Sequence, residues 1–107
     1  MQKRSYEEEC QMAEEIGRVY KASKMQAHLK ELYGSVYDNS RKYDGAKEYI
    51  DYVDEALRMC GTDTRYIITH EYLFPSDSKW YLGYFSKSTF YRLKRIAITE
   101  FLRCLDL

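Results

Sequence analysis

The sequence contains few residues that interrupt a helix, and this limits the folds it can adopt. It has one proline and five glycines in 107 residues, and the glycines are isolated from one another. Long helices are therefore favoured, and a glycine-rich phosphate loop is excluded. No window approaches the roughly 20 apolar residues of a membrane span, and no apolar run follows the first charges. We expect a cytoplasmic protein that does not interact with membranes.

Cysteine and histidine are also scarce. Cys10, Cys60 and Cys104 are far apart and form no CxxC pair, so neither a disulfide framework nor a zinc site is indicated. We interpret them as small core thiols of a reducing compartment. His28 and His70 lack any HExxH partner. We predict no metal, no cofactor and no catalytic residue, because nothing brings an acid, a base and a nucleophile together.

The formal net charge is zero, but the charged residues are unevenly distributed along the chain. The chain has 17 basic and 17 acidic residues. Residues 1–60 carry ten basic and twelve acidic residues (10 − 12 = −2), and residues 61–107 carry seven and five (7 − 5 = +2). Residues 79–99 hold five basic residues and no acid. A local positive patch is therefore expected near the C-terminus.

The first long element is predicted from about residue 3 to residue 33. Apolar residues recur at three- and four-residue steps, first at Tyr6, Cys10, Ala13, Ile16 and Tyr20, then in a shifted phase at Met25, Leu29, Leu32, Tyr33 and Val36. One long helix is favoured, and a break at 22–24 is the alternative. Gly34 is placed to end it. Its acidic residues, including the run 7–9, are read as a solvated helix face rather than as paired catalytic carboxylates.

A second helix is predicted from Ala46 to Cys60, after a cluster of turn-forming residues at 35–44. Its apolar spacing is the most regular in the chain, and Gly61 is expected to end it. The two helices would form an antiparallel hairpin or, if the first is left uncovered, a surface for homodimer formation.

A third helix is predicted from Thr62, taken as its N-cap, to Phe74. The run 66–68 also suits a strand, which is the competing interpretation. Residues 75–78 would end this element, a short helix would cover 79–82, and Gly83 would permit a tight turn.

The last helix is predicted to start after the N-cap residue Ser86. Its inward face would carry a broad apolar stripe made of Phe90, Leu93, Ala97, Ile98, Phe101, Leu102, Cys104 and Leu105. The 100° step of a helix then places Lys87, Ser88, Tyr91, Arg92 and Arg95 outward. The predicted fold is all-α: a helical hairpin over residues 1–60, followed by a three-helix, helix-turn-helix unit over residues 61–107.

The outward face of the last helix has the chemistry that reads a DNA major groove. Arginine can pair bidentately with guanine, hydroxyl groups can contact bases or phosphates, and lysine anchors the backbone. The helix N-terminus adds backbone donors for a phosphate. A solvated, charged helix face without a ligand is the alternative.

The run SKSTFYRLKRIA, residues 86–97, resembles the recognition helix of sigma-factor region 4 and of the related phage late-transcription regulators of the ArpU and RinA type. A small mollicute family is similar more loosely. The resemblance implies a helix-turn-helix that binds double-stranded promoter DNA and contacts RNA polymerase. It assigns DNA-facing positions to Lys87, Ser88, Thr89, Tyr91, Arg92 and Arg95, with Lys94 as a phosphate contact. Residues 74–85 depart from that family, because aromatics replace its acidic, alanine-rich scaffold helix.

Those aromatics support a second hypothesis, a protein-interaction adaptor without direct DNA binding. In this interpretation Trp80, Tyr81, Tyr84 and Phe85 form an exposed patch that docks RNA polymerase or another copy of the chain.

Overall fold

The fold is all-α. The computed structural model describes residues 4–34, 40–74 and 77–107, with side chains from residue 45 onward in the second range. It contains α1 (Tyr6–Tyr33), α2 (Ser40–Met59), α3 (Thr62–Ile68) and α4 (Lys87–Cys104). A π-helical segment, η2 (Thr69–Leu73), and a 3-10 turn, η3 (Trp80–Gly83), lie between α3 and α4. Within these ranges there is no strand, and none of the helices combines the length and the hydropathy that a membrane span requires.

Helix α1 is a single uninterrupted helix, as favoured from the sequence. Ser5 caps its start: the Ser5 side chain accepts the Glu8 backbone N–H, and the Glu8 carboxylate accepts the Ser5 N–H. This reciprocal pairing satisfies two backbone donors that would otherwise be unpaired. At the other end Gly34 adopts a positive φ of 50°, which a glycine tolerates well, and it ends the helix as predicted.

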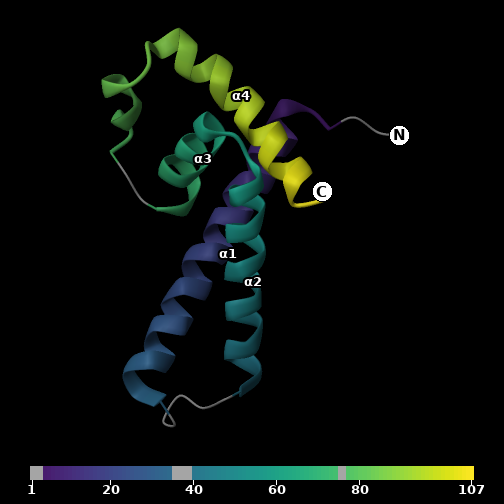
Figure 1. Ribbon diagram of the computed structural model, residues 1–107, viewed down its shortest axis with the longest axis vertical. Helices are drawn as coiled ribbons and strands as arrows, with labels where there is room; N and C mark the ends of the chain where they lie inside the picture. The colour runs from purple at the N-terminus through teal and green to yellow at the C-terminus, as the bar shows by residue number, and fades with distance from the viewer. Residues whose placement is uncertain (1–3, 35–39, 75–76) are drawn as a thin grey trace.

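Helices α1 and α2 form an antiparallel hairpin (Figure 1). Ala13, Ile16 and Tyr20 of the first apolar stripe of α1 are buried with Ile50, Val53 and Ala56 of α2 in one core. The Tyr20 hydroxyl donates to the Asp54 carboxylate at 2.8 Å. The predicted start of the second helix at Ala46 was wrong, because α2 begins at Ser40. Packing of the later turns offsets the roughly 1 kcal/mol that an internal glycine at position 45 costs. Residues 35–39 of the predicted turn lie outside the described residues.

The segment after α2 is helical rather than extended, so the strand alternative for residues 66–68 was wrong. Ile67 and Ile68 are fully buried on α3, where tertiary packing decides over their β propensity. The N-cap is Gly61, one residue before the predicted Thr62, and its backbone N–H donates to the Glu100 carboxylate of α4 at 3.3 Å.

The two predicted units share one hydrophobic core. Buried side chains from both helices of the hairpin and from α3, η2, η3 and α4 form a single cluster. Gly17 of α1 lies so close to the η2 backbone that an added Cβ would sit 2.3 Å from the Tyr72 carbonyl oxygen. The two ends of the described chain also meet, since the Arg4 guanidinium donates to the Leu107 carbonyl at 3.0 Å.

Candidate nucleic-acid interface

The start of α4 is built as the sequence predicted. Ser86 has an extended backbone conformation, and its side chain accepts the Thr89 backbone N–H at 3.3 Å. The Ser86 hydroxyl also donates to the Thr89 hydroxyl at 2.9 Å, and Thr89 is half-buried. The cap fixes where α4 begins, directly after the aromatic segment that precedes Ser86. Figure 1 shows the start of α4 and the far end of the α1–α2 hairpin at opposite ends of the molecule.

The inward face of α4 also matches the prediction. Phe90, Ala97, Ile98, Phe101 and Leu102 are buried, and Leu93 and Cys104 are half-buried. The Phe90 ring stacks face to face on Tyr81 of η3 with a centroid separation of 3.9 Å. This stack attaches the first turns of α4 to the segment before them.

Four of the seven predicted DNA-facing residues lie exposed on the first two turns of α4. These are Lys87, Ser88, Tyr91 and Arg92. No acidic residue occurs in α4 before Glu100, so nothing on the helix itself neutralises this cationic end. The exposed helix N-terminus and its positive side chains are suited to bind an anion.

Lys94 occupies a different environment from the exposed four. Its ammonium group lies 3.0 Å from the Glu71 carboxylate of η2, and both side chains are 19% exposed. The same ammonium lies 5.7 Å from the centre of the Tyr72 ring and 6.0 Å from that of Phe90. Lys94 therefore takes part in an internal ion pair, and a phosphate contact would have to compete with Glu71.

Arg95 contacts the amino-terminal part of the chain. Its guanidinium lies 4.3 Å from the centre of the Tyr6 ring of α1, a cation–π contact. One turn later the Thr99 hydroxyl donates to the Glu9 carboxylate at 2.8 Å. The start of α1 thus runs beside the middle of α4, where Arg95 itself stays exposed and the neighbouring Ile96 is 56% exposed.

The segment before α4 is an aromatic stack rather than a regular scaffold helix. The predicted short helix at 79–82 is the single 3-10 turn η3. The Trp80 ring stacks on His70 at 4.5 Å, and His70 stacks on Tyr66 at 5.0 Å. The indole N–H of Trp80 donates to the Glu71 carboxylate at 2.7 Å. Aromatic stacking and this hydrogen bond hold the turn in place of a longer hydrogen-bonded helix.

Glu71 joins these parts, and the sequence reasoning missed it. One carboxylate oxygen accepts from Trp80 and the other from Lys94, so Glu71 connects η2, η3 and α4. Its partners lie 9 and 23 residues away along the chain, beyond the reach of helical spacing. The signal available in the sequence was that Glu71 is an acidic residue shortly before the predicted turn at residues 75–78. That position does not show that Trp80 and Lys94 are its partners.

The aromatic patch proposed as an adaptor surface is exposed in part. Tyr81 is buried, and Trp80 and Phe85 are half-buried, so these rings mainly stabilise the fold. Tyr84 is 62% exposed, and the neighbouring Leu82 is 55% exposed. The ring centres of Tyr66 and Tyr84 lie 5.3 Å apart, and a hydrogen bond between the two hydroxyl groups raises the pKa of Tyr66. Leu82 and Tyr84 therefore form an exposed apolar surface beside the start of α4, whereas the predicted patch consisted of Trp80, Tyr81, Tyr84 and Phe85.

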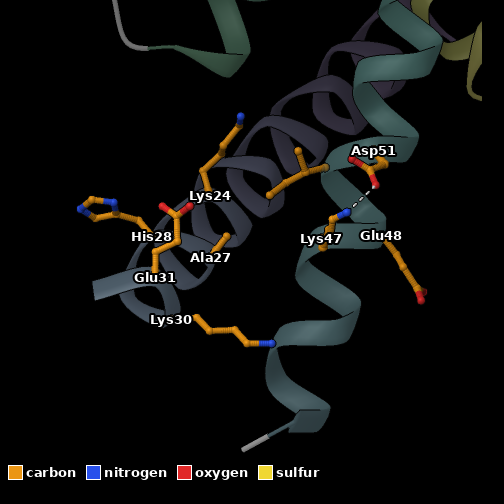
Figure 2. A pocket seen from close by; sticks show the side chains of 9 residues that line it. Lys24, Ala27, His28, Lys30, Glu31, Lys47, Glu48 and Asp51 are labelled. Carbon is orange, nitrogen blue, oxygen red and sulfur yellow. Dashed lines mark ion pairs between the residues drawn. The ribbon is translucent and has the colours of Figure 1, made fainter. Parts of the chain in front are cut away.

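A hollow opens between the distal halves of α1 and α2, with a volume of about 1000 Å³ (Figure 2). Its lining mixes both signs of charge: Lys24, His28, Lys30, Glu31, Lys47, Glu48 and Asp51. Lys47 and Asp51 form an ion pair at 3.9 Å, drawn as a dashed line in Figure 2. Mixed charges at an open wedge between helices do not select a ligand of one sign.

The remaining candidate sites have structural roles. Among the described residues no three of His, Cys, Asp and Glu come together to hold a metal. Of the acidic residues of α1, Glu8 caps the helix, Glu9 binds Thr99, and Glu15 pairs with Arg18. Cys60 is buried, and burial together with a hydrogen bond to Cys104 raises the pKa of its thiol to about 12. Such a thiol is a poor nucleophile at neutral pH.

Comparison with known proteins does not identify a class to which the chain belongs. No family model, no curated protein and no solved structure matches the chain.

Proposed function

We propose that the chain is a DNA-binding transcription regulator that contacts double-stranded DNA through the first two turns of α4 and acts with RNA polymerase. The supporting observation is the capped start of α4, where Lys87, Ser88 and Arg92 are exposed on a helix without acids before Glu100. Arginine and serine can reach base edges, and lysine can neutralise a phosphate. The resemblance of residues 86–97 to sigma-factor region 4 supports the same assignment.

The proposed contact is smaller than the sequence alone suggested. Lys94 and Arg95 already have partners in Glu71 and Tyr6. We expect Lys87, Ser88, Tyr91 and Arg92 to carry most of the affinity. Each phosphate neutralised contributes a salt slope of about −0.9, so a small number of contacts predicts a shallow salt dependence.

The experiment selects bound sequences from a labelled pool of random duplexes and then measures affinity for the enriched sequence. Arg92→Ala should weaken binding by about 1 to 3 kcal/mol if this side chain reads a base. Arg103→Ala is the matched control, because Arg103 is an exposed arginine at the other end of α4 and should bind as the parent does. Equal affinities for both variants and the parent would exclude the proposed groove contact.

The adaptor function is the second candidate, supported by the exposure of Leu82 and Tyr84. In that case the chain binds purified RNA polymerase without DNA, and the double variant Leu82→Ala/Tyr84→Ala loses this binding. Arg92→Ala should leave it unchanged. A gel shift at low salt, run beside polymerase co-purification, distinguishes the two functions.

A further inference from the structure

Two cysteines from distant parts of the chain meet where α2 and α4 end. Cys60 directly follows α2, and Cys104 is the last residue of α4. A hydrogen bond joins the two thiols. Cys60 is buried in the core, and Cys104 is half-buried against it. The fold thus pairs one protected thiol with one that a small molecule can reach.

Two further contacts fix the end of α2 against the end of α4. The Glu100 carboxylate of α4 accepts the Gly61 backbone N–H at 3.3 Å. The Leu105 carbonyl, directly after α4, accepts a hydrogen bond from the hydroxyl of Tyr52 on α2. Along α4 these contacts bracket Cys104, and Figure 1 shows the same two helix ends side by side. The surrounding structure therefore holds the two thiols together, in addition to their own weak hydrogen bond.

This arrangement is close to what a disulfide requires. A disulfide brings its sulfurs to about 2.05 Å and usually needs Cα atoms within about 7 Å of each other. The Cys60 S–H also donates to the Ala56 carbonyl at 3.3 Å, and this weak bond is given up on oxidation. Because Cys60 lies beyond the last helical residue of α2, its side chain can turn toward Cys104 without breaking the helix.

We propose that Cys60 and Cys104 are a site of reversible thiol oxidation, at which an intramolecular disulfide forms by exchange with a small organic disulfide such as oxidised glutathione. The Cys104 thiolate attacks one sulfur of the glutathione disulfide, whose S–S bond breaks and releases one glutathione thiolate. The Cys60 thiolate then attacks the Cys104 sulfur, and the second glutathione thiolate leaves. The two cysteine protons end on the released glutathione thiols, and two electrons pass from the cysteines to glutathione.

The relative rates of the two steps follow from burial. Burial, together with the hydrogen bond to Cys104, raises the pKa of the Cys60 thiol to about 12, so its attack is the slow step at neutral pH. The charge of Glu100 on α4 raises this pKa further, and the charge of Arg65 on α3 lowers it. Once glutathione occupies Cys104, the thiol hydrogen bond is gone, and the second step is intramolecular, which favours it. Oxidation should therefore be faster at mildly alkaline pH than at neutral pH.

Thiol counting on the full chain tests the pairing. The folded parent is treated with oxidised glutathione, its remaining thiols are alkylated, and the intact mass and the peptides are measured. One disulfide between Cys60 and Cys104 should form, with the loss of two hydrogen atoms. In urea the same treatment should also give pairings with Cys10, because the fold no longer selects the pair. A folded parent that keeps all its thiols reduced, stops at glutathione adducts or pairs Cys10 instead overturns the proposal.

Single variants separate the two roles. Cys10→Ser is the matched control and should form the disulfide as the parent does. Cys60→Ser should stop at a glutathione adduct on Cys104, and Cys104→Ser should leave the buried Cys60 reduced. Circular dichroism checks that each variant remains folded. If Cys104→Ser takes up glutathione at Cys60 as readily as Cys60→Ser does at Cys104, the proposed order of attack is wrong.

Thermal unfolding tests whether the fold is already shaped for this bond. An unstrained disulfide would close residues 60–104 into a loop and should raise the melting temperature by on the order of 10 °C. Dithiothreitol should reverse the shift, and Cys10→Ser should show the same shift. An oxidised parent that melts at or below the temperature of the reduced parent contradicts the proposed geometry. The inference is independent of DNA binding, because both cysteines lie at the opposite end of α4 from the proposed contact.

Discussion

Replacing Glu71 by alanine tests whether one carboxylate holds α4 to η2 and η3. Glu71 accepts from the Trp80 indole at 2.7 Å and from the Lys94 ammonium at 3.0 Å, in surroundings where it is only 19% exposed. The variant leaves an indole N–H and a partly buried cation without their acceptor. A hydrogen bond to a charged group contributes about 1.5 to 3 kcal/mol. Because water still reaches the site, we expect a total loss of about 2 to 4 kcal/mol of the free energy of unfolding.

Glu71→Gln separates the two contacts. An amide oxygen can still accept from Trp80, but the charge that pairs with Lys94 is gone, so the expected loss falls to about 1 to 2 kcal/mol. The control is Asp51→Ala, which removes the exposed ion pair with Lys47 at 3.9 Å. Exposed pairs of this kind contribute about 0 to 1 kcal/mol.

The assay is urea unfolding followed by circular dichroism and by fluorescence of Trp80, the single tryptophan. A loss of 2 to 4 kcal/mol should lower the urea midpoint by roughly 1 to 2 M. Trp80 fluorescence should also change in the folded variant, because its hydrogen-bond acceptor is removed. If Glu71→Ala unfolds at the same urea concentration as Asp51→Ala, Glu71 does not join η2, η3 and α4 as described.

Three further predictions concern the packing, the cap and the pH dependence. Gly17→Ala should destabilise the fold by about 1 to 3 kcal/mol, because the added Cβ would meet the Tyr72 carbonyl. Gly45→Ala should stabilise α2 by about 0.5 to 1 kcal/mol, because position 45 has open space around it. Thermal unfolding of both variants and the parent measures the two effects. Ser86→Ala should cost about 1 kcal/mol of stability and Ser86→Asp should restore most of it, so equal melting temperatures for all three proteins would exclude the cap. The raised pKa of Cys60 means that its contribution is complete below its ordinary pKa of 9.0 and is lost as pH rises toward about 12. Alkaline titration of the free energy of unfolding should therefore show a shallower decline for Cys60→Ala than for the parent.

Local chemistry explains which elements could be predicted. The end of α1 at Gly34, the cap at Ser86 and the inward face of α4 depend on residues within a few positions of one another. Hydrogen bonds of this range follow from side-chain type and helical spacing alone. The all-α class follows for the same reason, because few residues interrupt the helical periods. The start of α2 was misplaced because a turn-forming composition at residues 40–45 was overcome by packing in the turns that follow.

Tertiary contacts decided what is accessible for binding. Lys94 carries the same charge in the sequence as Arg92, yet Glu71 from a distant segment engages it and leaves its side chain 19% exposed, whereas Arg95 contacts Tyr6 and stays exposed. In the same way, Tyr81 and Tyr84 are both exposed-patch candidates by sequence, and a stack on Phe90 buries one of them. A sequence specifies the chemistry of each side chain, but its exposure depends on which distant segments pack beside it. The periodicity of α1 alone therefore revealed two apolar stripes, and the fold determined that the first is core and the second faces outward.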